Sequence, residues 1–292
     1  MAKSNLKVKK QASTANLKVV DKNAIKTTAY SDINLNDWRN YDHVKTDTLW
    51  EFPTRLKEGG HSNEYHGKYI PQIAQQIYER YTKQGDIVLD MFFGSGTSGI
   101  EAINMKRRCI GVELKEDLAE SVSEKFTPKQ LVTDVNIICA DSASEIAKEK
   151  IKARLDIMGR KQAQLLMLHP PYDDIIKFSD KKEDLSNCSS TEEFYDLFEK
   201  VAKNGYDMLE KGRFACLIIG DKYANSQHIP LGFECMARMN KLGFITKAII
   251  IKDMQGNERA KGKTANLWRY RALAGGFYIF KHEYVMVFQK VK

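Results

Sequence analysis

From residue 70 onward, the chain alternates short apolar runs with longer amphipathic stretches. Most of the runs are followed by a turn residue, which is typical of a buried strand. The runs predict strands at 87–90, 109–113, 135–139, 164–168, 214–219, 244–251 and 284–289. The stretches predict helices at 70–82, 97–105, 115–125, 143–157, 191–209 and 231–242. Strands and helices that alternate in this way indicate an α/β fold, a parallel sheet covered by helices on both faces.

Composition excludes several classes of protein. Of the 292 residues, 42% are hydrophobic and 29% charged, and no apolar run approaches the roughly 20 residues that cross a bilayer. The sequence MAKSNLKVKKQAS lacks an apolar stretch behind it, so we do not expect a secretory signal. The five scattered cysteines form no CxxC pair and no zinc spacing, which argues against a disulfide framework or a metal site. We therefore expect a cytoplasmic protein.

Positive charge is concentrated at the two ends of the chain. The formal net charge is +8, with +6 in residues 1–30 and +7 in residues 245–292, so residues 31–244 carry −5. Basic ends on a mildly acidic body suggest that the ends contact a phosphate backbone. Residues 1–30 are predicted to be a disordered arm, and a solvated tail without a partner is the alternative. No repeat or low-complexity linker divides residues 31–292, which we predict to be one domain.

Residues 253–282 break the alternation of strands and helices. The segment is rich in Gly, Lys and Arg with aromatic residues interleaved, a composition suited to phosphate contact and base stacking. We interpret it as an insertion that recognises the target. Its candidate contacts are Arg259, Lys261, Lys263, Arg269 and Arg271. The insertion is short, so either the recognised site is small or a second protomer or specificity subunit completes the grip.

A glycine loop follows the first predicted strand. Gly94, Gly96 and Gly99 satisfy GxGxxG between a strand and a helix, and Glu113 ends the next strand. Glycines let the backbone approach a ligand closely, and an acid at the second strand end can accept hydrogen bonds from ribose hydroxyls. This spacing does not separate NAD from S-adenosylmethionine, because both present an adenosine ribose.

A second loop, His169-Pro170-Pro171-Tyr172, follows the fourth predicted strand. The carboxyl ends of parallel strands line one crevice, so this loop should lie beside the glycine loop. Two prolines stiffen it and leave carbonyl acceptors, and the tyrosine ring offers a face to a flat heterocycle. Such a loop could hold the amino group of a base toward an electrophilic methyl group. An NAD-dependent dehydrogenase would leave the loop unexplained.

Together the two loops resemble those of the amino-methylating DNA methyltransferases, which use S-adenosylmethionine to modify adenine N6 or cytosine N4. The family's first motif, an acid followed by F-x-G-x-G-T, is matched by Asp90, Phe93, Gly94, Gly96 and Thr97. Its fourth motif, [D/N/S]-P-P-[Y/F/W], is matched by Pro170, Pro171 and Tyr172 but not by His169. HGKYIPQIAQQIYERY resembles the segment that holds the methionine end of the cofactor, and KHEYVMVFQK the final strand.

The resemblance, over residues 46–292, implies a Rossmann-like sheet of seven mostly parallel strands with the last one antiparallel. It also implies cofactor contacts for the motif residues: the glycine loop from Asp90 to Thr97 binds the cofactor, Glu113 its ribose and Asp141 its adenine. The residues expected near its carboxylate are His66, Lys68 and Pro71.

The implied chemistry is positioning of a flipped base whose amine attacks the methyl group. His169 departs from the family, whose usual residue supplies an oxygen acceptor. A neutral imidazole has one acceptor nitrogen and a protonated imidazole has none. We therefore hypothesise that the enzyme works with His169 neutral and loses rate as the pH falls toward 6.

Double-stranded DNA is the expected partner, since no RNA-binding module is recognisable. The target amine stays open: Asp at the variable position favours adenine and Ser cytosine in this family, and His follows neither habit. We place adenine N6 ahead of cytosine N4. The alternatives are an RNA base methyltransferase and a non-catalytic relative that binds cofactor and nucleic acid.

Overall fold

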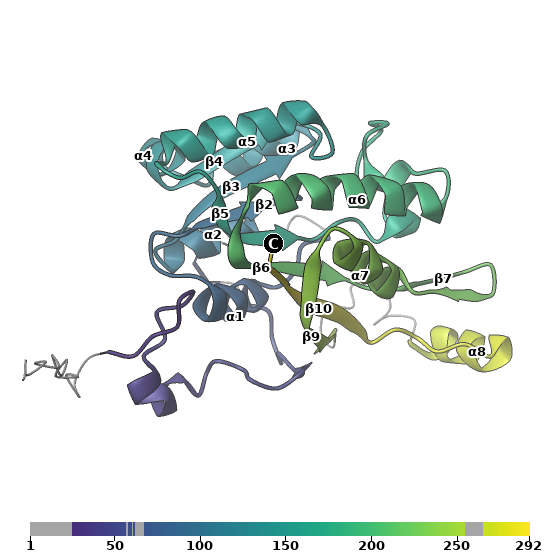
Figure 1. Ribbon diagram of the computed structural model, residues 1–292. Coiled ribbons are helices and arrows are strands. Elements are labelled where there is room, and N and C mark those ends of the chain that lie inside the picture. Colours follow the sequence, from purple (N-terminus) through teal and green to yellow (C-terminus); the bar gives the residue numbers. More distant parts are fainter. Residues whose placement is uncertain (1–24, 57, 60, 62–66, 255–264) are drawn as a thin grey trace, which may run out of the picture.

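The apolar runs assemble into one eight-stranded sheet in the computed structural model (Figure 1), which describes residues 25–56, 58–59, 61, 67–254 and 265–292. In spatial order the strands are β1 (Leu49–Trp50), β9 (Phe244–Asp253), β10 (His282–Lys290), β6 (Leu209–Ile219), β5 (Ala163–Leu168), β2 (Ile87–Asp90), β3 (Arg108–Glu113) and β4 (Val135–Cys139). Strand β10 runs antiparallel to both of its neighbours, and the other pairs are parallel.

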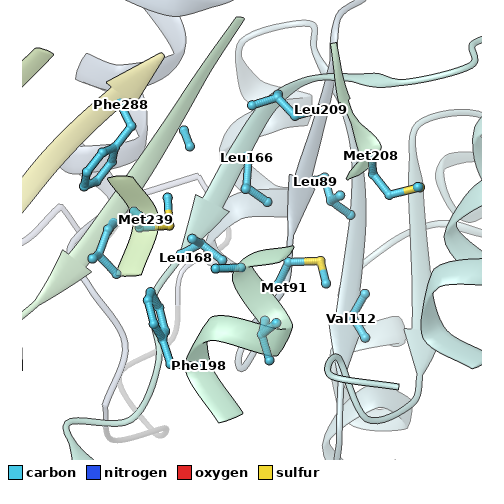
Figure 2. Close-up of a cluster of buried hydrophobic side chains, with 14 of the residues drawn as sticks. Leu89, Met91, Val112, Leu166, Leu168, Phe198, Met208, Leu209, Met239 and Phe288 are labelled. Carbon is cyan, nitrogen blue, oxygen red and sulfur yellow. The ribbon is translucent and has the colours of Figure 1, made fainter. Parts of the chain in front are cut away.

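Helices cover both faces of the sheet because the strands are apolar on both faces. One face carries α1 (Pro71–Tyr81), α2 (Thr97–Asn104) and α3 (Glu116–Ser123), and the other carries α5 (Glu145–Ile157), α6 (Thr191–Met208) and α7 (Leu231–Lys241). Successive strand residues point to opposite faces. In β2, Val88 packs into the cluster with α1, whereas Leu89 packs into the cluster with α6, which Figure 2 shows around Phe198.

Smaller elements complete the described chain. A short helix α4 (Pro128–Thr133) precedes β4, strands β7 (Lys222–Ala224) and β8 (Gln227–Ile229) form a separate hairpin, and α8 (Ala265–Gly275) lies between β9 and β10. Three 3-10 turns span Leu35–Tyr41, Asp173–Ile175 and Leu185–Asn187. Within the described ranges, no helix has the length and apolar character needed to cross a membrane.

The α/β prediction is confirmed: all seven predicted strands belong to the sheet, and the last is antiparallel. The six predicted helices also occur. The two-residue strand β1 was not predicted, because it is defined only by parallel pairing with β9, about 200 positions away. Of the predicted basic arm 1–30, residues 1–24 lie outside the described chain.

Candidate active site

A pocket that is partly open to solvent lies at the carboxyl edge of the parallel strands. Its walls come from the segment before α1, the loops after β2, β3, β4 and β5, and one residue of α6. The structure brings nine of the predicted site residues to these walls: Lys68, Phe93, Gly94, Thr97, Glu113, Asp141, His169, Pro170 and Pro171. The cofactor motif and the proline loop therefore line the same space.

Asp90 does not line the pocket, but its carboxyl group holds the glycine loop through two hydrogen bonds. One of its oxygens accepts a hydrogen bond from the backbone N–H of Phe92 at 2.9 Å, and the other accepts one from the hydroxyl of Ser98. Burial raises the pKa of Asp90 to about 6, although the bonds from Ser98 and Phe92 act against it. The carboxyl group therefore fixes where the loop leaves β2 and where α2 begins.

Gly96 also lies behind the pocket wall, as the residue that caps α2. Its φ is +80°, a conformation that costs other residues free energy. A Cβ atom here would also come within 2.7 Å of the Val122 side chain. Gly96 therefore shapes the turn, and its neighbours Gly94 and Thr97 reach the pocket.

Glu113 at the end of β3 links two loops of the site. Its carboxylate accepts the backbone N–H of Gly94 at 2.8 Å on one oxygen and that of Lys115 at 2.9 Å on the other. Burial raises the pKa of Glu113, and these two donors oppose the rise. A carboxylate oxygen can accept two bonds, so each oxygen keeps capacity for one hydroxyl of a ribose.

Asp141 stands on the pocket wall after β4. One of its carboxylate oxygens accepts the backbone N–H of Ala143 at 2.9 Å, which fixes the direction of the side chain. The adjacent Ser142 donates its hydroxyl to the carbonyl of Met91 at 2.6 Å. That bond ties the loop after β4 to the loop after β2.

The segment before α1 forms the remaining wall. Lys68 and Tyr69 line the pocket, and Arg55 donates to the backbone carbonyls of both, at 3.2 and 3.0 Å. Pro71 is buried as the first residue of α1 and does not line the pocket. His66 lies outside the described residues.

The proline loop places His169 between two aromatic rings. The ring of Tyr69 stands perpendicular to it at 5.3 Å and that of Tyr172 at 5.8 Å, between centroids. Tyr172 is not part of the pocket wall; its hydroxyl donates to Glu283 at 2.7 Å and lies 3.5 Å from Nε2 of His169.

The surroundings of His169 change the pH range in which its imidazole is neutral. Removal from bulk water lowers its pKa to about 4; Glu283 opposes this shift, and Lys252 and Arg55 add to it. The hypothesis of a loss of rate toward pH 6 assumed the ordinary pKa of imidazole. With the lowered pKa of His169, we expect the neutral imidazole to be lost near pH 4 instead.

Sequence reasoning missed Glu283 and Lys252, which stand behind the proline loop. It also missed several wall residues: Tyr69, Leu114, Lys115, Ser142, Phe178 and Leu185. Lys252 and Glu283 lie one residue outside the apolar runs 244–251 and 284–289, so no local pattern indicated that they are buried. Their importance depends on which strands pair, which the sequence pattern does not show.

The predicted nucleic-acid contacts divide into two groups. Arg259, Lys261 and Lys263 lie outside the described residues, and Arg269 and Arg271 are exposed on α8. Within α8, the guanidinium of Arg271 lies 5.4 Å from the centroid of the Trp268 ring. After the helix, Phe277 stacks on Tyr223 of β7, with 4.8 Å between the ring centroids. The segment that contains α8 therefore packs against the β7–β8 hairpin, at the end of the molecule where Figure 1 shows both.

Comparison with known proteins agrees with this geometry. A family model for N6/N4 methyltransferases, described as DNA methylase, matches residues 2–124 and 163–292. The chain belongs to this DNA methylase family. Its cofactor is S-adenosylmethionine, and the residues present fit that molecule, because Glu113 retains acceptor capacity for a ribose and Asp141 faces the same pocket.

Individual relatives match over shorter stretches. Identity is 37% over 87 residues with "Probable type III restriction-modification enzyme HindVI Mod subunit" of Haemophilus influenzae, covering 28% of this chain and 12% of the relative. It is 34% over 87 residues with type II methyltransferase M2.DpnII of Streptococcus pneumoniae, covering 28% of this chain and 29% of the relative. The matches thus span less than a third of either relative. TrmN from Thermus thermophilus aligns with a TM-score of 0.49 and 15% identity over 77% of this chain and 50% of TrmN.

Proposed function

We propose that this DNA methylase transfers a methyl group from S-adenosylmethionine to the exocyclic amine of a flipped base in double-stranded DNA, with adenine N6 ahead of cytosine N4. The observation that carries the proposal is that Glu113 and the glycine loop share one pocket with His169, Pro170 and Pro171. A pocket for the cofactor alone would not need a rigid acceptor loop on the adjoining strand.

The residues on each side of the pocket have separate tasks. S-adenosylmethionine, when bound, supplies an electrophilic methyl group. Glu113 and Asp141 orient the adenosine end, and Lys68 lies where the carboxylate end would be held. The neutral imidazole of His169 and the backbone carbonyls beside it accept hydrogen bonds from the target amine. Those bonds direct the amine lone pair at the methyl group, so the chain contributes positioning rather than a strong base.

Nucleic acid is gripped, in this proposal, by the cations of residues 253–282. Arg269 and Arg271 are exposed on α8, beside the hairpin to which the segment packs. One relative is named as a subunit of a type III restriction-modification enzyme and another as a type II methyltransferase. These names support a site-specific reaction. Because the insertion is short, we propose that a second protomer or a specificity subunit completes the contact.

The test compares methyl transfer to DNA and to RNA of the same base sequence. The protein is incubated with methyl-labelled S-adenosylmethionine and with double-stranded DNA, single-stranded DNA or RNA, and label in each polymer is counted. We expect transfer to double-stranded DNA, abolished or strongly reduced in His169→Ala. Label in RNA alone would establish an RNA methyltransferase instead. Cofactor binding with no transfer to any of these polymers would point to a non-catalytic relative.

A further inference from the structure

A buried ion pair lies directly behind the proline loop. Glu283 and Lys252 are opposite each other in the register of β10 and β9, and Nζ lies 3.0 Å from one carboxylate oxygen. The side chains are 9% and 1% exposed. A pair this buried contributes little net stability, because desolvating both charges offsets their attraction. Stability therefore does not account for the pair, and its contacts at the active-site edge are those of a group that orients a neighbour.

The second oxygen of Glu283 is taken by Tyr172, whose hydroxyl lies 2.7 Å away. Burial raises the pKa of Tyr172 well above its ordinary value, so the phenol keeps its proton. Burial alone would raise the pKa of Glu283, but Lys252, His169 and the Tyr172 hydroxyl lower it below its ordinary value. The carboxylate is therefore the acceptor and the phenol the donor.

This direction decides what Tyr172 can offer to His169. A phenol has one proton, and here it is donated to Glu283. Toward Nε2 of His169, 3.5 Å away, the phenol oxygen is left as an acceptor. A lone pair on Nε2 would face that oxygen unfavourably, so the arrangement favours a proton on Nε2. Among the described residues, no hydrogen bond involves Nδ1.

The ring of Tyr172 can reach this position because residue 220 is glycine. A Cβ atom at Gly220 would come within 2.9 Å of Cε2 of Tyr172. Gly220 directly follows β6, and Tyr284 pairs with Ile219, the last residue of β6. Glu283, one residue before Tyr284, therefore stands at the same sheet edge as the glycine. The fold thus brings the carboxylate and the space for the phenol together.

We propose that Glu283, held by Lys252, is a positioning residue: through Tyr172 it keeps His169 in the tautomer that carries the proton on Nε2, which leaves Nδ1 to accept the hydrogen bond from the target amine. The role of Nδ1 toward the amine rests on the proposed function, whereas the tautomer does not. The other groups around His169 are compatible with it, since Arg55 is cationic and Tyr69 presents a ring at right angles.

The decisive experiment reads the tautomer directly. Protein with ¹⁵N-labelled histidine gives imidazole nitrogen shifts by long-range ¹H–¹⁵N NMR, and His169 is assigned by its absence in His169→Asn. We expect the wild-type protein at pH 7 to show a protonated Nε2 and an unprotonated Nδ1. The reverse pattern would overturn the proposal, whether or not the protein methylates DNA. Failure to methylate any polymer would instead overturn the proposed function.

Variants then test the relay. Tyr172→Phe should give mixed tautomers and lower kcat about 10-fold, the loss of one hydrogen bond, with an unchanged KM for the cofactor. Glu283→Gln should also give a mixture of the two His169 tautomers. The matched control is Tyr284→Phe. Tyr284 follows Glu283 in β10 and donates its phenol proton to the carboxylate of Asp221 at 3.0 Å, so this variant loses a similar bond and should leave the His169 signals unchanged. If Tyr172→Phe leaves both tautomer and kcat as in wild type, the relay is wrong.

Discussion

The backbone N–H of Gly94 donates a hydrogen bond to the carboxylate of Glu113 at 2.8 Å. Gly94 lies in the loop after β2, and Glu113 ends β3, the parallel neighbour of β2. The acid thus holds the glycine loop in place and presents itself to the pocket at the same time. Loss of Glu113 should therefore affect the cofactor pocket in two ways, through the missing acceptor and through a looser loop.

Replacing Glu113 with alanine should weaken cofactor binding at least 10-fold, because hydrogen bonds to a charged group contribute about 1.5–3 kcal/mol. Titration calorimetry with S-adenosylhomocysteine measures the change in Kd without requiring turnover. Glu120→Ala, at an exposed position of α3, is the control and should bind as wild type does. Equal affinity of the Glu113 variant would remove this residue from the cofactor site.

Asp90 predicts a pH dependence of folding. Its pKa in the folded protein is about 6, above the ordinary 3.8, so the folded state binds the proton more tightly than the unfolded chain does. The stabilisation from this proton is present at low pH and is lost as the pH rises from about 4 to about 6, a cost of about 3 kcal/mol. Asp90→Asn should remove that loss.

Urea unfolding at pH 4.5 and pH 7 checks the prediction for Asp90. The free energy of unfolding of wild type, relative to that of the Asn variant, should be lower at pH 7 than at pH 4.5. The control Asp117→Asn alters an acid whose side chain is 76% exposed and should follow wild type. If Asp90→Asn shows the same change with pH as wild type does, the buried carboxyl does not titrate in this range.

The rate of methyl transfer should be nearly independent of pH between 5.5 and 8 as far as His169 is concerned. With a pKa of about 4, about 99% of the imidazole is neutral at pH 6, and kcat should fall only below about pH 5. The measurement is kcat at saturating cofactor and DNA, with circular dichroism to establish folding at each pH. A drop centred near pH 6.5 that disappears in His169→Asn would show that the imidazole titrates as an ordinary histidine.

Removing four cations of the insertion should weaken DNA binding and flatten its dependence on salt. The substitutions are Lys261→Ala, Lys263→Ala, Arg269→Ala and Arg271→Ala. If each contacts a phosphate, the slope of log K against log salt falls by about 3 to 4. The control removes four exposed cations elsewhere, at Lys129, Lys152, Arg154 and Arg160. Unchanged DNA affinity in the first variant would exclude the insertion as the DNA-binding segment.

The fold could be predicted where apolar runs are bounded by turns. Strands β2 and β4 have the predicted bounds to the residue, because each is short and apolar with a break at both ends. Strand β6 begins five residues earlier than predicted, at Leu209, because its first part contains charged, exposed positions. Helix α8 has no apolar stripe, and the sequence therefore contained no periodic signal for it.

The site could be predicted only as far as local motifs extend. The glycine loop and the proline loop are each continuous in sequence, so their residues could be named in advance. Lys252 and Glu283 look like surface charges in a one-dimensional pattern, and only the pairing of β9 with β10 buries them together. The lowered pKa of His169 comes mainly from burial, with smaller and opposing effects of Glu283 and Lys252, and the sequence pattern does not show how deeply a loop residue is buried.

In the proposed reaction, the methyl group is added to an exocyclic amine of DNA. Mass spectrometry of nucleosides, after incubation of unmethylated double-stranded DNA with the protein and S-adenosylmethionine followed by complete digestion, tests it most directly. We expect N6-methyldeoxyadenosine, or else N4-methyldeoxycytidine, at levels that His169→Ala reduces strongly. A methyl group found on a ring carbon such as C5 of cytosine, or no methylated nucleoside from DNA at all, would contradict it.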